Sequence, residues 1–485
     1  MSLLIAGVTW LKLEAETAPF VAALFYAAAG LMVVTAIVCL CRAVPAKNEV
    51  RFCICLALAA FAIRELFVLL VPTEPVSDFG NMYSAALDMV RGNDVLNDRT
   101  YFQWWPYQSG MVLWMALWVR LFGAGVGFFQ TMNCLCGAGT AVLVYALARR
   151  FASTQGARAA GLLYLLYPTS ILLSPVLTNQ HLSELLLLAA LYVATGGERA
   201  MKPQLLRGGA AGLLLALSHI IRPAAVVAVA AVLAVLILEL LQWKELGSHG
   251  LMPVVGGTLA VALIYFLVTR GASWLVQVTG LNDYGLGNNV PLWKFILGFN
   301  VDTAGRYSEA DALIVFASDS LTDIQEASRR LLEERLASLT PGQLLTLFWE
   351  KIKGMWGKFE PAWWAFTQNV TDLYAARGQG EVLTWTLEKY KRLASGLSIA
   401  GSLLIAAGCV RAAMKEERGR RAALLLVLTA LAYFCAHLLI EIQERYRTTL
   451  FVVAFPLAAI GADWMAELCG RFLARLKKKR KEIHS

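Results

Sequence analysis

The sequence predicts an all-α fold: a polytopic transmembrane helical bundle of about 11–12 helices, with an interfacial helix in the first outer loop and a mainly helical outer cap. Hydrophobic residues make up 58% of the 485 residues and charged residues 16%, and the mean hydropathy is +0.59. Soluble domains contain about 45–50% apolar and about 25% charged residues. The composition therefore excludes a soluble cytosolic enzyme and predicts a multi-pass membrane protein.

Twelve apolar runs are candidate membrane helices. Several are shorter than the roughly 20 residues that a perpendicular helix needs, so we expect them to borrow flanking residues or to lie where protein lines them. The runs cover 18–41, 52–71, 106–122, 126–148, 158–175, 182–196, 208–221, 224–241, 251–269, 395–410, 422–440 and 449–465.

Two long polar segments divide the chain into parts. Residues 1–51 add one N-terminal transmembrane helix before the main membrane module, which covers 52–269 and contains the first outer loop at 72–105. Residues 270–394 form an extracytoplasmic cap segment, and 395–485 contain the last membrane helices and a basic tail.

The net charge of +9 comes largely from basic clusters between the apolar runs. The segment 270–394, in contrast, has 13 basic and 14 acidic residues. The positive-inside rule therefore predicts a plasma-membrane protein with a cytoplasmic C-terminus and with 72–105, 270–394 and 441–448 outside. Because the bases are spread over loops, nucleic acid is excluded as a partner. The basic clusters lie at 42–51, 149–158, 199–207, 411–421 and 471–481.

One stretch conflicts with this topology. If both 106–122 and 126–148 crossed the membrane fully, Arg149 and Arg150 would lie outside. We therefore expect that one of these two runs does not cross completely.

The nine cysteines do not predict a metal site or a disulfide framework. All lie in or beside apolar runs, and none lies between 270 and 394. The three C-x-C pairs lack a second pair of Cys or His ligands nearby. The sequence therefore predicts no metal ligands.

The first outer loop contains the first candidate catalytic residue, Asp78. It precedes a stretch with apolar residues at helical spacing, which predicts a short interfacial helix. Asp78 fits the N-cap of this helix, and it equally fits a base that takes a proton from a hydroxyl. The aromatic segment 101–107 follows, where Tyr101, Trp105 and Tyr107 are candidate substrate-binding residues at the membrane boundary.

A second candidate group lies where two apolar runs meet at LSHIIRP. Arg222 precedes Pro223, and its planar guanidinium matches phosphate oxygens. His219, three residues earlier on the same helical side, would add a donor. Alternatively, Arg222 is an interfacial side chain that extends to water.

The segment EIQERYRTTL at 441–450 has four charges within seven residues at a membrane boundary. We interpret it as a binding site in which Arg445 or Arg447 binds a lipid phosphate and one acid positions an arginine. Its remaining candidate substrate-binding residues are Glu441, Glu444 and Tyr446.

His181 and Glu184, in LTNQHLSELLLL, are candidates to orient a sugar. Glu184 also fits a carboxylate at the start of a helix, where it would complement the helix dipole.

These features together resemble the GT-C polytopic glycosyltransferases, in particular dolichyl-phosphate-mannose protein mannosyltransferases and bacterial aminoarabinose transferases. The resemblance covers most of 52–465. It rests on SDF with Asp78, WPYQSG at 105–110, IIRP with Arg222, GFNVDTAGRYSEAD at 298–311 and ERYR. The family has an acidic pair in its first loop. Here Phe79 follows Asp78, so the second acid is missing or is supplied by Asp88.

The resemblance implies a sugar donor linked to a polyprenyl monophosphate and an acceptor lipid, glycan or protein that arrives from outside. Asp78 would deprotonate the acceptor hydroxyl, and Arg222 with Arg445 or Arg447 would stabilise the departing phosphate as the sugar inverts. It implies no required cofactor, and nothing in the sequence supports a divalent metal.

Two other functions remain open from the residues alone. A lipid-linked sugar transporter or flippase would place ionisable residues near the bilayer midplane on broken helices. A glycan ligase or polymerase that uses diphosphate-linked donors would also need arginines at the outer face.

Overall fold

The computed structural model describes residues 1–17, 20–43, 48–196, 200–241, 243–357, 362–414 and 419–484. Throughout these ranges the secondary structure is helical, which confirms the predicted all-α polytopic bundle. Among the described residues, eight helical stretches are long and apolar enough to cross a membrane, and Gln180–Ala194 and Val226–Leu241 are shorter apolar helices.

The first part of the chain contains three long helices, the first outer loop with its short helices, and the helix that follows the loop. α1 was not predicted from the sequence. It packs against α21 and η2, where the Thr9 hydroxyl donates a hydrogen bond of 3.2 Å to the Trp356 carbonyl. The elements are α1 (Ser2–Thr17), α2 (Phe20–Ala43), α3 (Glu49–Leu70), α4 (Ser77–Val90), α5 (Val95–Asp98), α6 (Thr100–Trp104), η1 (Pro106–Gln108) and α7 (Ser109–Phe122).

The predicted run 106–122 is not one long helix. The run 106–122 forms η1 and the 14-residue α7. At 1.5 Å per residue α7 is about 21 Å long, less than the roughly 30 Å of a hydrocarbon core. It packs on α4 instead, with Met111, Val112 and Met115 buried against Met82. The run 106–122 therefore contains no helix of the roughly 20 residues that a perpendicular crossing needs.

A second predicted run, 158–175, is interrupted. Pro168 has no backbone N–H and restricts the residue before it, so the helix ends near Leu165 and a short helix follows. The middle of the chain contains α8 (Val126–Ala148), α9 (Thr154–Leu165), α10 (Pro168–Leu172), α11 (Gln180–Ala194), α12 (Met201–Ile221), α13 (Val226–Leu241) and α14 (Trp243–Val278).

Glycines allow the closest helix contacts in the bundle. A Cβ atom on Gly208 of α12 would lie 2.1 Å from the carbonyl oxygen of Gly257 on α14. Gly208 and Gly257 are therefore packing positions, as small residues in membrane helices commonly are.

The cap lies between α14 and α21. Residues 309–338 form two helices, separated where Phe316 packs against Trp104 of the first outer loop. The cap elements are α15 (Trp293–Gly298), α16 (Glu309–Val315), α17 (Leu321–Ser338), α18 (Pro341–Ile352), the π-helical turn η2 (Lys353–Gly357), α19 (Ala362–Ala365) and α20 (Gln368–Ala376).

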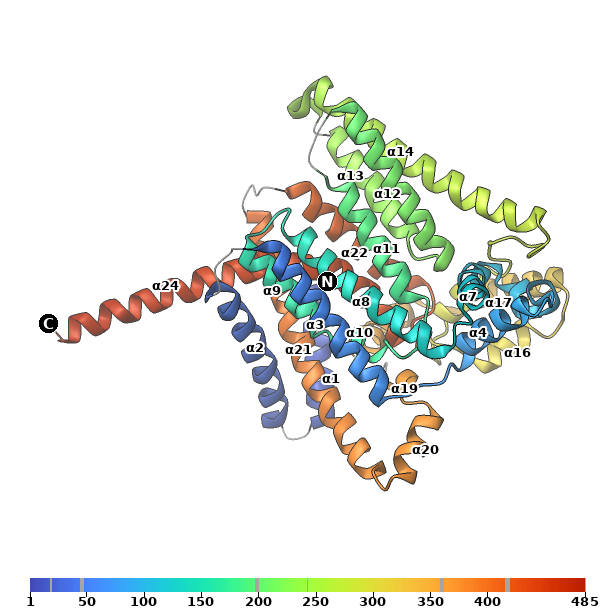
Figure 1. The fold of residues 1–485 in the computed structure, drawn as a ribbon, viewed down its shortest axis with the longest axis horizontal. Helices are drawn as coiled ribbons and strands as arrows, with labels where there is room; N and C mark the ends of the chain where they lie inside the picture. Colours follow the sequence, from blue (N-terminus) through green and yellow to red (C-terminus); the bar gives the residue numbers. More distant parts are fainter. Residues whose placement is uncertain are drawn as a thin grey trace.

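The last part returns to the bundle. Its elements are α21 (Gly380–Met414), α22 (Arg420–Leu439), η3 (Glu444–Tyr446), α23 (Arg447–Ala454), η4 (Phe455–Leu457) and α24 (Ala458–His484). In Figure 1, helix α4 of the first outer loop and the next long helix, α7, lie beside α16 and α17 of the cap, at the end of the molecule opposite the C-terminus of α24.

Candidate functional site

The segment between α22 and α23 is attached to the cap through its backbone. The Glu441 amide donates to the Lys294 carbonyl and the Ile442 amide to the Gly305 carbonyl, each at 2.8 Å. This segment therefore lies where the bundle and the cap meet.

Asp78 lies in the first turn of α4 and accepts a hydrogen bond. The Tyr101 hydroxyl donates to Asp78 Oδ1 at 3.0 Å, and Gln108 Nε2 donates to the Tyr101 hydroxyl at 3.3 Å. Burial, and then the Asp78 carboxylate, raise the pKa of Tyr101, so this phenol stays protonated as a donor. The N-cap residue of α4 is Val76, with no side-chain cap bond, so the N-cap interpretation of Asp78 was wrong.

Arg445 lies directly beside this part of α4. Its guanidinium carbon is 4.8 Å from the ring centre of Phe79, the residue after Asp78, and 4.9 Å from that of Trp364. Its Nε donates to Gln443 Oε1 at 2.6 Å. These contacts with aromatic faces keep the cation in place at a buried position.

Arg222 approaches the same region from α12. Its guanidinium carbon is 4.9 Å from the ring centre of Tyr446, and that of Arg445 is 5.2 Å from the same ring. Arg222 Nη1 also donates to Asn179 Oδ1 at 3.0 Å. The structure thus brings together Arg222, Arg445 and Tyr446.

A cation that the sequence analysis did not identify lies in the cap. Lys294 forms an ion pair with the buried Glu441 carboxylate. Burial opposes both charges, but Glu441 raises the pKa of Lys294 and Lys294 lowers the pKa of Glu441, so both groups are charged. The pKa of Tyr107 is raised to about 12, mainly by burial. Lys294 opposes this rise, and Tyr446, Asp78 and Glu441 add to it. Tyr107 and Lys294 therefore lie in the same charged environment as Asp78.

Aromatic side chains join the first outer loop to the cap. Trp104 stacks on Phe316 with ring centres 4.4 Å apart. Trp105 contacts Tyr101 at 5.1 Å and Phe316 at 5.6 Å, both edge-to-face. The predicted residues Tyr101 and Trp105 thus lie together between Asp78 and the cap.

A second ion pair connects the cap to this segment. Arg306 Nη2 lies 3.4 Å from Glu444 Oε1. The ion pairs of Glu441 and Glu444 are thus with Lys294 and Arg306 of the cap. Glu441 is also connected to Arg445 through Gln443, which donates to Glu441 Oε1 at 3.0 Å and accepts from Arg445 Nε at 2.6 Å.

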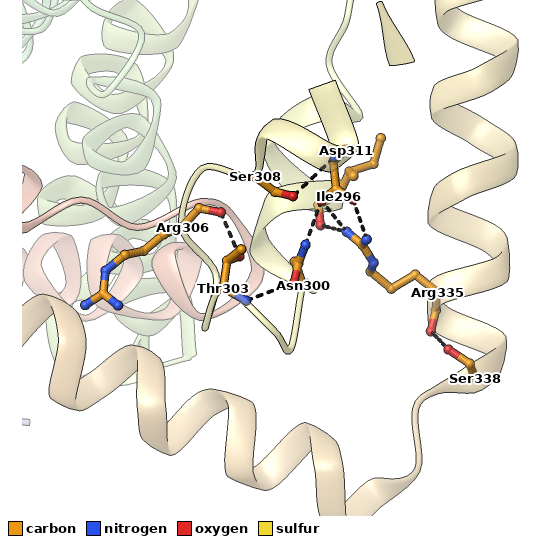
Figure 2. A network of polar contacts seen from close by, with 8 residues as sticks. All are labelled: Ile296, Asn300, Thr303, Arg306, Ser308, Asp311, Arg335 and Ser338. Carbon is orange, nitrogen blue, oxygen red and sulfur yellow. Dashed lines mark hydrogen bonds and ion pairs between the residues drawn. The ribbon is translucent and has the colours of Figure 1, made fainter. Parts of the chain in front are cut away.

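The loop that carries Arg306 is stabilised by a polar network (Figure 2). Arg335 of α17 donates to both carboxylate oxygens of Asp311, at 2.8 and 3.0 Å, and Asn300 Nδ2 donates to Asp311 at 2.7 Å. Burial opposes the Asp311 charge, but Arg335 and Asn300 lower its pKa. The stretch 298–311 thus has a structural role in the cap.

Glu184 of α11 contacts the residues that directly follow Arg447. It accepts hydrogen bonds from Thr448 at 2.6 Å and Thr449 at 2.8 Å, and it is buried. Because it is the fifth residue of α11, the interpretation as a helix-start carboxylate was wrong. Glu184 therefore positions the start of α23. His181 is buried one turn earlier.

Two predicted residues lie apart from this group. Asp88 is about 15 Å along α4 from Asp78 at 1.5 Å per residue, and it pairs with Arg91 at 2.9 Å and Arg99 at 2.6 Å. His219 Nδ1 is 2.7 Å from the Tyr265 hydroxyl of α14. Asp88 therefore does not replace the missing second acid beside Asp78, and His219 faces α14.

Arg447, two residues after Arg445, is 2% exposed and lines a narrow pocket between α2, α9, α21 and α23. The pocket walls are mostly apolar and include Leu163, Leu397 and Phe451. Walls of this kind favour the apolar part of an amphipathic ligand.

Residues 109–274 match the family model for dolichyl-phosphate-mannose-protein mannosyltransferase. The match confirms the predicted resemblance, over a narrower segment than expected. It runs from α7 into α14 and includes Arg222, but Asp78, Arg445 and Arg447 lie outside it. No curated protein matches the sequence.

Two solved structures are similar to the chain. Archaeal oligosaccharyltransferase AglB from Archaeoglobus fulgidus, solved with an inhibitory peptide and a dolichol-phosphate, aligns with 87% of this chain and 52% of its own at 14% identity and a TM-score of 0.46. The apo oligosaccharyltransferase from Archaeoglobus fulgidus aligns with 84% and 50% at 15% identity and a TM-score of 0.43. This chain thus spans about half the length of the structures that it matches.

Within the described ranges, no three His, Cys, Asp or Glu side chains are grouped so that they could ligate a metal ion.

Proposed function

We propose that the chain is a membrane glycosyltransferase that moves a sugar from a polyprenyl-monophosphate carrier to an acceptor hydroxyl at the outer face of the plasma membrane. The contact between Arg445 and Phe79 supports this most directly. It sets a guanidinium beside the helix turn that carries Asp78. Glycosyl transfer from a lipid phosphate needs both a base and a cation.

In the proposed reaction, the Asp78 carboxylate takes the proton of the acceptor hydroxyl. The acceptor oxygen then bonds to the anomeric carbon from the face opposite the phosphate, which inverts that carbon. The bond between this carbon and the phosphate oxygen breaks, and its electron pair stays on the phosphate. Arg222 and Arg445 stabilise the added negative charge. The Tyr101 hydroxyl orients the carboxylate.

The pocket beside Arg447 supports a donor with an apolar carrier. Its walls are apolar, and a guanidinium lies at its boundary. We propose that the polyprenyl chain enters this pocket while Arg447 contributes to binding the phosphate. The acceptor, a lipid, glycan or protein, would approach the aromatic residues Tyr101, Trp105 and Tyr107. No cofactor enters this mechanism.

The test uses the purified full chain with radiolabelled polyprenyl-phosphate sugars and a membrane extract. We expect label to move to an acceptor, with release of the lipid phosphate. Asp78→Asn should abolish transfer, whereas Asp98→Asn, an exposed acid of the same loop, should not.

Other outcomes would contradict the proposal. Normal turnover by Asp78→Asn would exclude this residue as the base. Transfer only from diphosphate-linked donors would favour a ligase or polymerase. Movement of labelled lipid across vesicles without transfer would favour a transporter.

A further inference from the structure

A pocket lined by two arginines and several valines lies beside two of the basic clusters, 199–207 and 411–421. It is a small pocket formed by α12, α13, α14 and α22. Two arginines line it, Arg207 of α12 and Arg421 of α22. The mechanism proposed above uses neither residue.

Arg207 has an unused hydrogen-bond donor in this pocket. Its Nη1 is buried and has no hydrogen-bond partner in the part of the chain that the structure describes. The side chain is fixed against the end of α11, because a Cβ atom on Gly196 would lie 2.9 Å from Arg207 Nε. A buried donor without an acceptor is costly, so an acceptor from a bound molecule would be favourable.

The charge of the pocket selects an anion. Arg421 Nε forms an ion pair with Glu239 Oε1 at 3.2 Å. Arg207 and Arg421 are the charged residues of the lining that the structure describes, and Glu239 of α13 pairs with Arg421, so a net positive charge remains at this lining. The planar fork of arginine matches phosphate oxygens in particular.

The apolar walls select a phosphate attached to a lipid. Val232, Val235 and Val261 line the pocket beside the arginines, and Leu205 and Leu206 are exposed on the adjacent surface of α12. Three of the surrounding helices are long and apolar enough to cross a membrane, and both arginines lie within two turns of their ends. Basic pockets between membrane helices at this depth bind the headgroups of anionic lipids.

We propose that this pocket binds the phosphate of an anionic phospholipid, with Arg207 and Arg421 as its ligands and the acyl chains along the valine wall. This site is independent of the proposed glycosyl transfer.

The test measures thermal unfolding of the purified full chain in a neutral detergent. Added phosphatidylglycerol should raise the Tm, while phosphatidylcholine should not. Arg207→Gln should weaken the apparent affinity for phosphatidylglycerol about tenfold or more, because a charge-assisted hydrogen bond is lost. Lys202→Gln removes the same charge from an exposed position of the same helix and should leave the affinity unchanged.

A second measurement needs no variant. Native mass spectrometry of the wild-type chain, titrated with equal amounts of the two lipids, should show phosphatidylglycerol retained in preference. Equal retention or equal Tm shifts for the two lipids would overturn the proposal, as would an equal loss in Lys202→Gln. A Tm shift from inorganic phosphate alone would replace the lipid with a free anion and overturn it as well.

Discussion

The guanidinium of Arg445 lies 4.8 Å from the ring centre of Phe79, which joins the segment after α22 to the helix that carries Asp78. Residues separated by more than 360 positions thus depend on each other for their placement. Trp364 contacts Arg445 as well, at 4.9 Å, so the cation lies near two aromatic faces.

Phe79→Leu should therefore weaken donor use without unfolding the protein. Leucine keeps the site apolar but removes one aromatic face, and a cation–π contact contributes about 1 kcal/mol. We expect kcat/KM for the lipid-linked donor to fall about fivefold, measured with radiolabelled donor at low concentration. An unchanged kcat/KM would mean that Phe79 does not position Arg445. Phe122→Leu is the matched control, because this ring is exposed at the end of α7.

Lys294 and Glu441 should behave as a unit. Lys294→Met would leave the buried Glu441 carboxylate without its cation, which costs about 3 kcal/mol. We expect a large drop in Tm for this variant and a smaller drop for the double variant Lys294→Met/Glu441→Gln. The check is a double-mutant cycle of thermal unfolding. Additive changes in Tm would show that the ion pair does not couple the cap to the bundle.

The sequence predicted the fold class because the apolar runs are long and their loops are basic. It could not predict which runs are complete. The end of α7 has a local signal, because Gly123 adopts the left-handed conformation that terminates helices, but its packing on α4 is a tertiary contact without one. The break in the run 158–175 did have a local signal, Pro168.

The candidate site was predicted in part. Arg445 and Tyr446 stand out because charges are costly at a membrane boundary, and Asp78 stands out in a short outer loop. Lys294 and Arg306 could not be found in this way. Each is one of many charges in a near-neutral segment. Only the fold brings an acid from the segment after α22 to each of them, Glu441 to Lys294 and Glu444 to Arg306. Asp88 failed as a candidate because Arg91 and Arg99 neutralise it locally.

Lys351 should make the stability of the folded protein depend on pH. Its buried ammonium donates to the carbonyls of Gly298, Leu438 and Ile440 at 2.7–2.8 Å, at the ends of α15 and α22. Burial lowers its pKa to about 7, although the Glu441 carboxylate acts in the opposite direction. Because this pKa is below that of a lysine in the unfolded chain, the unfolded state binds more protons above pH 7.

The Tm of the wild type should therefore rise between about pH 7 and pH 9 relative to that of Lys351→Met. The variant should also have a lower Tm at every pH, because three carbonyls lose their donor. Thermal unfolding of both proteins across this range is the measurement. Parallel pH profiles would mean that Lys351 does not titrate in this range.

The pocket beside Arg447 gives a prediction about the length of the carrier lipid. Gly401 of α21 lines this pocket, and a Cβ atom there would meet no atom within 4 Å. Gly401→Leu would therefore fill the pocket without a clash at its first carbon. We expect the KM for a long-chain polyprenyl-phosphate sugar to rise about tenfold, because buried apolar chain contributes about 0.8 kcal/mol per CH₂ group. A donor with a single isoprenoid unit should be affected much less, since its chain ends before the filled part.

Gly271→Leu on α14, also without an atom within 4 Å of the added Cβ, controls for the gain in helix propensity. An equal rise in KM for the long and the short donor would show that the polyprenyl chain lies elsewhere.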